Sequence, residues 1–430
     1  MSLKVKPKVV IHYLLIYFMI ILNQSNLYKY FLAEYNSILL VVLVGILIIK
    51  KRYRDYSILG FCLFLLIDVI ITRFIVGGVG LSAWINWVLK IGFCYVAVKY
   101  DSIESFIKRY INVVVFLAGC SLVGYLIGIA FPSFFTSGLF TKYDTLFISE
   151  RTWISENSYL AKYYNSFGTL FYTFTEHETL RNVGIFSEPG VYQMVLNSAI
   201  AMILFWGDKL SFKKRKNKIR CLAILAIALF TSQSTTGYIG FLATIAVYMF
   251  SKNADDGRIK YRVLEAIFVV TFLIAFDYGQ RGSNSFIAST VLKKVLNASG
   301  SLDILADTGA YRWGMILVAL KSMITHPFGV GYDSFRVLAD AQNTGFVAAQ
   351  VIQTGAVYGI PMFLGIIFWV VYPIIRYERR LNTKIIFIFL YFNTALAQSS
   401  EFYPTLIVFG IILYCSKGLF QDSRAECIVN

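Results

Sequence analysis

The sequence predicts an all-α integral membrane protein with about twelve transmembrane helices, and three observations lead to this fold class. Of its 430 residues, 57% are hydrophobic and only 15% are charged, whereas soluble domains are about 45–50% apolar and ~25% charged. Apolar runs long enough to cross a bilayer, which takes roughly 20 residues, recur along nearly the whole chain. Basic residues gather on alternate connections between these runs. These properties exclude a soluble enzyme, a disulfide-stapled secreted domain, a nucleic-acid-binding module and a disordered chain.

The apolar runs and their connections form a single polytopic domain over residues 1–430. The first run follows three lysines, as in a signal peptide, but no small-residue cleavage site comes after it, so a retained helix is expected. The predicted spans lie at residues 9–24, 36–50, 57–76, 81–98, 111–131, 188–206, 219–235, 237–250, 263–278, 351–375, 385–398 and 402–416.

The formal net charge of +16 reflects the topology of these spans rather than an acidic partner. With the N-terminus inside, most of the 40 Lys and Arg residues fall on connections that are then cytoplasmic, as the positive-inside rule requires. Both termini are therefore predicted to lie in the cytoplasm. Any binding of acidic lipid headgroups is expected to be a secondary effect.

Neither a disulfide framework nor a metal or nucleotide site is expected. The six cysteines fall within spans or on the inner side, where no oxidising compartment would pair them. The sequence contains no C-x-x-C or H-E-x-x-H spacing and no G-x-x-x-x-G-K phosphate loop. The cytoplasmic connections are too short to hold a nucleotide-binding domain. We therefore expect no metal ion and no cofactor.

Two long connections, residues 132–187 and 279–350, are both predicted to lie on the outer side. Long loops within a compact domain are usually functional, so any chemistry is expected on this face. The first loop is rich in aromatic residues, which fit either a surface that stacks sugars or an aromatic belt at the headgroup level. The second contains a helical stretch at 307–325 whose apolar face and isolated charges favour a helix lying in the interface plane.

Two charged residues fall inside predicted spans, where isolated charges are costly and usually partnered. Asp68 and Lys90 lie at similar depths on either side of an expected turn near residues 77–80. We predict a buried ion pair that fixes the register of this helical hairpin. A role in proton relay is the alternative.

The segment Arg181–Gly190 is the strongest local signal, at the point where the first long loop enters a span. Pro189 suits the first turn of a helix. Glu188 before it can cap the free N–H groups and complement the helix dipole, which is a purely structural explanation for this carboxylate. Arg181 is expected at the same outer interface, where it would form an anion site together with the helix N-terminus.

A second cluster occupies the other long loop, in the segments Ala310–Trp313 and His326–Arg336. Gly329 and Gly331 permit a tight turn close to a ligand. The positive-inside rule predicts few cations on the outer side, and a lipid-linked diphosphate at the membrane surface would explain those that are there. The outer arginines of this loop are Arg281, Arg312 and Arg336.

Taken in order, these segments resemble the motifs of the O-antigen ligase/polymerase superfamily. Arg181–Gly190 resembles its R-x-x-G-x-F-x-E-P signature, and Thr231–Gly237 resembles its T-x-S-x-[ST]-R-T-G turn between two spans. Arg312 followed by His326–Gly331 is similar to its R…H-P-x-x-G-x-G loop. The resemblance covers roughly residues 170–360, and the flanking spans agree only in hydropathy.

The resemblance implies a GT-C-like glycosyltransferase of the bacterial inner membrane that uses undecaprenyl-diphosphate-linked glycans on the periplasmic face. Two departures from the family pattern matter. Thr235 stands where an arginine is common, so one cation is missing. Asp340–Asn343 stands where the ligases carry a His-Asn pair, which favours the O-antigen polymerase branch (Wzy). That function implies a chain-length regulator and a flippase as protein partners, and no nucleic acid.

The expected reaction transfers the growing glycan from its lipid diphosphate to a hydroxyl of an incoming repeat unit. Arg181 and Arg312 are the first candidates for neutralising the leaving diphosphate. Arg281 and Arg336 come second for the same role. Glu188 is the best-placed general base for the attacking hydroxyl. The secondary candidates for acid–base chemistry are His326, Asp333, Asp340 and Glu401.

Alternatives stay open for single residues and for the whole chain. Glu401 is also typical of a solvated turn, and His326 of a residue that structures its loop. An O-antigen ligase, which transfers polymer to lipid A core, is the nearest alternative function. A transporter of lipid-linked oligosaccharides belongs to another class. It should show inverted repeats with interrupted helices, and no corresponding pair of interrupted spans is evident in the sequence.

Overall fold

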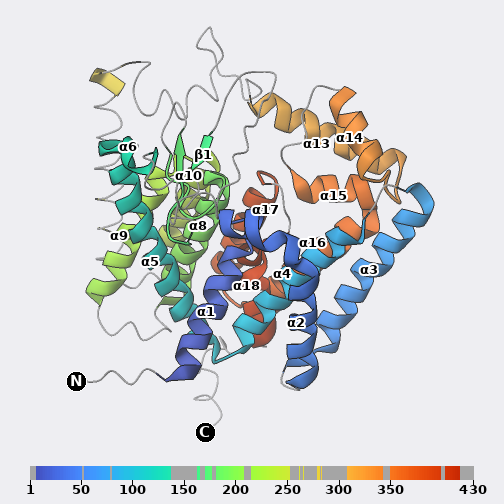
Figure 1. Ribbon diagram of the computed structural model, residues 1–430, viewed down its shortest axis with the longest axis horizontal. Helices are drawn as coiled ribbons and strands as arrows, with labels where there is room; N and C mark the ends of the chain where they lie inside the picture. The colour runs from blue at the N-terminus through green and yellow to red at the C-terminus, as the bar shows by residue number, and fades with distance from the viewer. Residues whose placement is uncertain are drawn as a thin grey trace.

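The computed structural model of the protein (Figure 1) describes residues 6–50, 53–77, 80–136, 162–164, 170–176, 181–207, 215–251, 261, 265, 278–280, 282, 308–341, 349–398 and 402–416. Helices account for nearly all of this part of the chain, as predicted. Before the first long loop the elements are α1 (Pro7–Ile21), η1 (Tyr28–Leu32), η2 (Ala33–Tyr35), α2 (Asn36–Ile49), α3 (Tyr56–Val76), α4 (Leu81–Lys99), α5 (Ile103–Ala130) and α6 (Pro132–Thr136).

The first long loop contains a short antiparallel pair of strands that the sequence did not predict. β1 (Lys162–Tyr164) pairs with β2 (Phe174–Glu176), with Lys162 opposite Glu176. The later helices are α8 (Pro189–Trp206), α9 (Arg215–Thr231), α10 (Thr235–Phe250), α13 (Thr308–Thr325), α14 (Tyr332–Ala341), α15 (Gln350–Tyr358), α16 (Ile360–Tyr377), α17 (Leu381–Ala395) and α18 (Pro404–Ser416).

Five of the described helices are long and apolar enough to cross a membrane, namely α3, α4, α5, α8 and α16. Shorter apolar helices, among them α1, α10 and α18, belong to the same bundle. The chain is therefore an all-helical, multi-pass membrane protein. The predicted total of about twelve spans exceeds the number of long helices among the described residues, and most of the predicted span at 263–278 lies outside them.

The helix boundaries follow the predicted spans closely, with two differences. α5 begins at Ile103 rather than near residue 111, because Ser102 caps its first turn by accepting a hydrogen bond from the Ser105 N–H at 3.2 Å. The single span predicted at 351–375 is broken into α15 and α16 at Gly359, whose φ is 103°. Only glycine adopts this backbone conformation without strain.

The core of the bundle is formed by helices that are buried on all sides. Every residue of α8 from Val191 to Trp206 is buried, and most of α18 is buried as well. Outer helices instead present large apolar side chains, such as Phe74 of α3, which is 86% exposed, and Phe368 of α16, which is 64% exposed. Exposed apolar faces of this extent are typical of surfaces that contact lipid.

The bundle has two distinct ends (Figure 1). The start of α1 and the end of α18 lie at one end, and β1, α6, α13 and α14 lie at the opposite end. We call these the terminal end and the loop end. The positive-inside rule predicts that the terminal end faces the cytoplasm, and the same prediction assigns the candidate site residues to the outer face.

Asp68 and Lys90 do not form the predicted ion pair. The Lys90 side chain is buried, with its Nζ atom over the ring of Tyr403 at 5.1 Å from the centroid. The Oδ2 atom of Asp68 is also buried, and it accepts no hydrogen bond from the described residues. The two charges are therefore accommodated separately.

The register of α3 against α4 explains why these two residues do not meet. The indole N–H of Trp84 donates to the carbonyl of Cys62 at 2.9 Å, which sets the level at which the helices touch. From that level α4 runs towards the terminal end to reach Lys90, whereas α3 runs towards the loop end to reach Asp68. At ~1.5 Å per residue, Asp68 and Lys90 each lie about 9 Å along the helix axis from the Trp84–Cys62 contact, in opposite directions.

Candidate functional site at the loop end

The segment Arg181–Gly190 lies at the loop end and leads directly into α8. Residues 182–187 are buried, so the backbone of this segment needs partners within the protein. Three neighbouring segments supply them. The hydrogen bonds are Asn26 N–H to Ile185 O at 3.0 Å, Thr173 N–H to Gly184 O at 2.6 Å and Asn182 N–H to Thr231 O at 3.0 Å.

Neutral polar side chains fix the same segment from the sides of α5 and α9. Asn182 Nδ2 donates to Ser121 Oγ at 3.1 Å and to Thr231 Oγ1 at 3.0 Å. The hydroxyl of Tyr192 on α8 lies 2.6 Å from the same Ser121 oxygen. Gly184 has a φ of 61°, and a Cβ atom there would come within 2.8 Å of the Tyr192 ring. Glycine is therefore required at this position by both conformation and space.

The second motif, Thr231–Gly237, forms the turn between α9 and α10 and packs against the first. Ser234 caps α10 by accepting a hydrogen bond from the Gly237 N–H at 3.3 Å. Asn197 Nδ2 on α8 donates to the Gly237 carbonyl at 3.0 Å. A Cβ atom on Gly237 would come within 2.8 Å of Gln193. The fold thus brings together two motifs that are separated in sequence, beside the N-terminal half of α8.

Arg181 is half-buried beside these two motifs. Its Nε atom is buried and has no hydrogen-bond partner among the described residues. Burial lowers the pKa of Arg181, and the nearby phenol of Tyr238 opposes that shift. The guanidinium nevertheless stays cationic at physiological pH. Tyr238 comes directly after the Thr231–Gly237 motif, in the first turn of α10. It was not predicted from the sequence as a site residue, although its position next to the motif is a signal that could have identified it.

Glu188 occupies the position before the first turn of α8, and Pro189 begins the helix, as predicted. The predicted capping by the carboxylate is wrong, because the side chain accepts no hydrogen bond from the first turn. Its backbone carbonyl instead accepts from the Val191 and Tyr192 N–H groups at 3.2 and 3.3 Å. The Glu188 side chain is exposed at the loop end. The structure records no ion pair between it and Arg181 among the described residues.

The third motif, His326–Gly331, docks against the break between α15 and α16. It satisfies backbone groups that a broken helix would otherwise leave without partners. The bonds are Val330 N–H to Ala356 O at 3.0 Å, Gly331 N–H to Val357 O at 3.1 Å and Ile360 N–H to Pro327 O at 2.8 Å.

The glycines of the third motif are explained by contact with the protein itself. A Cβ atom on Gly329 would lie 2.3 Å from the Val357 carbonyl oxygen, and one on Gly331 would lie 2.9 Å from the Gly77 carbonyl oxygen. Both have positive φ. Close approach of the protein backbone therefore explains both glycines, and the expected approach of a ligand stays a prediction. His326 is exposed, and its Nδ1 atom bonds to the hydroxyl of Thr325 at 2.9 Å, which agrees with a role in structuring the loop.

The remaining predicted residues of this loop that the structure describes lie on the exposed side of α14. Asp333, Arg336 and Asp340 are all exposed, and Arg336 Nε lies 3.9 Å from Asp340 Oδ2. Such an exposed pair contributes little stability. Phe335 and Ala339 are buried on the opposite side of the helix. The helix is therefore amphipathic, and Figure 1 shows α13 and α14 at the loop end.

The structure brings together only part of the predicted site. Arg281, Glu401 and the side chain of Arg312 lie outside the described residues, although the backbone of Arg312 belongs to α13. The first and third motifs are linked through α15. Its first residue, Gln350, donates to the carbonyl of Gln398 at 3.2 Å, and the Gln398 side chain packs against Gly190. The third motif lies at the far end of this helix, about 13 Å away at ~1.5 Å per residue.

Comparison with known proteins adds no further assignment. No family model, no curated protein sequence and no solved structure matches this chain.

Proposed function

We propose that the chain is a polysaccharide polymerase of the O-antigen type. In this proposal it transfers a growing glycan from undecaprenyl diphosphate to a hydroxyl of an incoming lipid-linked repeat unit on the outer face of the inner membrane. The proposal rests on the sequence resemblance together with one geometric observation. Arg181 is a half-buried cation whose Nε atom has no hydrogen-bond partner among the described residues, and it lies where two of the resembling motifs meet.

The chemistry requires a cation near the leaving diphosphate. A hydroxyl oxygen attacks the anomeric carbon, the bond from that carbon to the diphosphate oxygen breaks, and the hydroxyl proton passes to a base. Arg181 would bind the diphosphate, assisted by the N-terminus of α10, where Tyr238 lies near the guanidinium. Glu188 would accept the proton, because its carboxylate is exposed at the loop end beside the start of α8. Arg312 is the second candidate for binding the leaving diphosphate.

The test is reconstitution of purified protein with undecaprenyl-diphosphate-linked repeat units from the organism that encodes it. We expect a ladder of glycan lengths on a gel without added metal or nucleotide. Arg181→Ala should slow elongation by about 100-fold or more, which is typical for loss of one group that stabilises developing negative charge. Arg220→Ala is the matched control, because this exposed arginine lies near the start of α9, away from the proposed site. A ladder should persist in that variant.

Failure of the folded wild-type protein to extend its own repeat unit would contradict the polymerase proposal. Lipid A core would then be supplied as acceptor, since capping of the core by polymer identifies a ligase. An equal loss in Arg181→Ala and Arg220→Ala would remove Arg181 from the site while leaving the polymerase proposal intact.

A transporter of lipid-linked oligosaccharides is the second candidate, and one observation favours it. The break between α15 and α16 interrupts a membrane-spanning segment, and interrupted helices are typical of transporter binding sites. Asp68 lies on the same ridge of α3 as Thr72 and Phe64, which contact this broken region at Tyr358 and Gly365. Movement of labelled lipid-linked oligosaccharide across liposomes, without any change in glycan length, would identify a transporter.

A further inference from the structure

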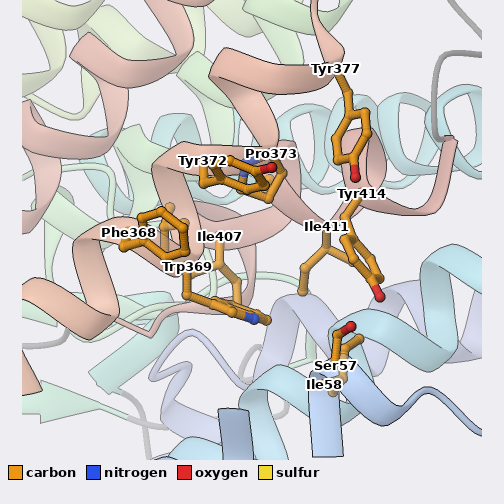
Figure 2. A pocket seen from close by; sticks show the side chains of 12 residues that line it. Ser57, Ile58, Phe368, Trp369, Tyr372, Pro373, Tyr377, Ile407, Ile411 and Tyr414 are labelled. Carbon is orange, nitrogen blue, oxygen red and sulfur yellow. The ribbon is translucent and has the colours of Figure 1, made fainter. Parts of the chain in front are cut away.

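A cavity of about 280 Å³ lies near the terminal end, away from the candidate site. It is enclosed by the start of α3 and by the last turns of α16 and α18 (Figure 2). The residues that define it best are Ser57, Trp369, Tyr372, Tyr377, Ile411 and Tyr414. No residue of the proposed polymerase site lines it.

Local features of α16 and α18 create this cavity. Gly410 allows α18 to approach α16 closely, because a Cβ atom there would lie 2.7 Å from the Val370 carbonyl oxygen. Pro373 lies inside α16, and proline in a helix removes one hydrogen bond and bends the helix. Towards the loop end the cavity is closed by the rings of Trp369 and Phe61, which stack at 4.4 Å between centroids.

The walls of the cavity are aromatic and aliphatic, with phenol hydroxyls near the terminal end (Figure 2). The side towards the bilayer is bordered by Phe368 and Tyr372, which are 64% and 44% exposed. Aromatic residues with a polar tip are typical of the depth at which hydrocarbon meets headgroups. The cavity therefore combines an apolar interior with access from the lipid-facing surface.

Two arginines at the terminal end lie close in sequence to residues that line the cavity, Arg54 before Ser57 and Arg376 before Tyr377. Arg376 follows Tyr372 and Pro373 by one turn of α16, so it shares their face of the helix. Arg54 precedes the start of α3 and donates to the carbonyl of Ile48 at 2.8 Å. Both side chains are exposed, and neither forms an ion pair with the described residues.

The carboxylates nearest to these arginines in the chain are Glu378, which is paired with Arg380, and Asp55, whose single negative charge is outnumbered by the basic groups around it. The Oδ1 atom of Asp55 accepts hydrogen bonds from the Ser57 and Ile58 N–H groups at the start of α3. It also accepts from the hydroxyl of Tyr414 at 2.7 Å. Lys99 lies nearby and donates to the hydroxyl of Tyr95 at 2.6 Å, and this hydroxyl in turn contacts Asp55 at 3.4 Å. The cavity mouth is thus cationic overall.

We propose that this cavity seats one acyl chain of an anionic phospholipid whose phosphate binds Arg376 and Arg54. Ligand pockets usually measure roughly 300–1,000 Å³, so a cavity of about 280 Å³ holds part of one chain while the rest of the lipid stays in the bilayer. The positive-inside rule puts this end at the cytoplasmic leaflet, where anionic lipids attract basic residues. The site is independent of the proposed enzymatic function.

The experiment compares phosphatidylglycerol with phosphatidylcholine carrying the same acyl chains, added to delipidated protein in detergent. Native mass spectrometry counts bound lipids, and thermal unfolding measures protection. We expect phosphatidylglycerol to bind and to raise the unfolding temperature more than phosphatidylcholine does. Arg376→Gln should weaken its binding about fivefold, as expected for loss of one basic residue near an anionic surface. Lys108→Gln, an exposed basic residue of α5 near the terminal end, should leave binding unchanged.

A second variant tests the cavity itself. Ile411→Phe places a larger side chain into the space and should reduce phosphatidylglycerol binding, with a wild-type unfolding temperature in lipid-free detergent confirming the fold. Equal binding of the two lipids would overturn the proposal. So would equal losses in Arg376→Gln and Lys108→Gln, or unchanged binding in folded Ile411→Phe protein.

Discussion

The two ends of the bundle are held together by different kinds of polar contact. At the terminal end the contacts are ionic. Asp101 accepts hydrogen bonds from Lys8 at 3.0 Å and from Arg109 at 2.8 Å. Burial alone would raise the pKa of Asp101, but these hydrogen bonds outweigh it and lower the pKa to about 2. Arg380 Nε lies 3.3 Å from Oε1 of Glu378, a carboxylate that is almost completely buried.

At the loop end the corresponding contacts are made by amides and hydroxyls. Asn23 Nδ2 donates to Thr405 Oγ1 at 3.0 Å and Asn26 Nδ2 donates to Thr173 Oγ1 at 2.8 Å. Asn182 joins α5 to α9 in the same way. None of these bonds uses a charged group, and each links segments that are far apart in sequence.

The difference between the ends indicates where charge is used for stability and where it is available for function. At the terminal end the fold pairs Lys8, Arg109 and Arg380 with carboxylates, and Arg54 and Arg376 are left for the proposed lipid site. At the loop end the neutral network holds the fold, and Arg181 keeps a buried N–H without a partner among the described residues. A cation whose hydrogen bonds are not used by the fold is the kind of group that an anionic substrate can recruit.

The largest effect on stability is expected at the buried carboxylate of the terminal end. Glu378 accepts from Trp206 Nε1 at 3.1 Å as well as from Arg380. Glu378→Ala should destabilise the protein by about 3 kcal/mol, because it leaves a partly buried guanidinium uncompensated. Glu104→Ala, which removes an exposed carboxylate near the same end, should stay within about 0.5 kcal/mol. Thermal unfolding in detergent measures both, and similar values for the two would contradict the ionic description of this end.

A smaller effect is expected at the centre of the neutral network. Asn182→Ala removes the amide that bridges Ser121 and Thr231, and leaving buried partners unsatisfied costs about 1–3 kcal/mol. Asn112→Ala is the control, because this exposed amide makes one bond, to Tyr13. Chemical denaturation of both variants in detergent gives the comparison. If Asn182→Ala is as stable as the control, the neutral network does not hold the loop end together.

Almost no coupling is expected between Asp68 and Lys90, which lie between the two ends. Because their helices place them at different levels, the effects of Asp68→Asn and Lys90→Met should add within about 0.5 kcal/mol in a double-mutant cycle. Unfolding of both single variants and of the double variant provides the three values needed. A coupling energy well above 1 kcal/mol, on the order of values found for contacting residues, would show that Asp68 and Lys90 do form the predicted ion pair.

The spans could be predicted from the sequence because lipid leaves a helix few alternatives. A segment in hydrocarbon must satisfy its own backbone hydrogen bonds, so hydropathy alone places helices such as α4 and α8 within a residue or two of their observed bounds. The break at Gly359 could not be predicted in this way. The break depends on docking of the distant segment His326–Gly331. The sequence around Gly359 does not show which segment packs against it.

The candidate site was predictable to a similar degree. The place of Glu188 and Pro189 at the start of α8 followed from local helix signals. The neighbours of Arg181–Gly190 did not, because Asn26 and Ser121 reach this segment only through tertiary packing. Pairing of Asp68 with Lys90 failed for the same reason, since the register of two helices is set by contacts such as that of Trp84, not by distance from a turn.

The short helix α15 has a mechanical consequence. Its 9 residues are held at the first turn by Gln398 and at the last turn by the N–H groups of Val330 and Gly331. It cannot slide along its axis without breaking hydrogen bonds at both ends, so it connects two parts of the loop end rigidly. A displacement of the His326–Gly331 loop is therefore transmitted to the entrance of α8, where Gln398 packs on Gly190.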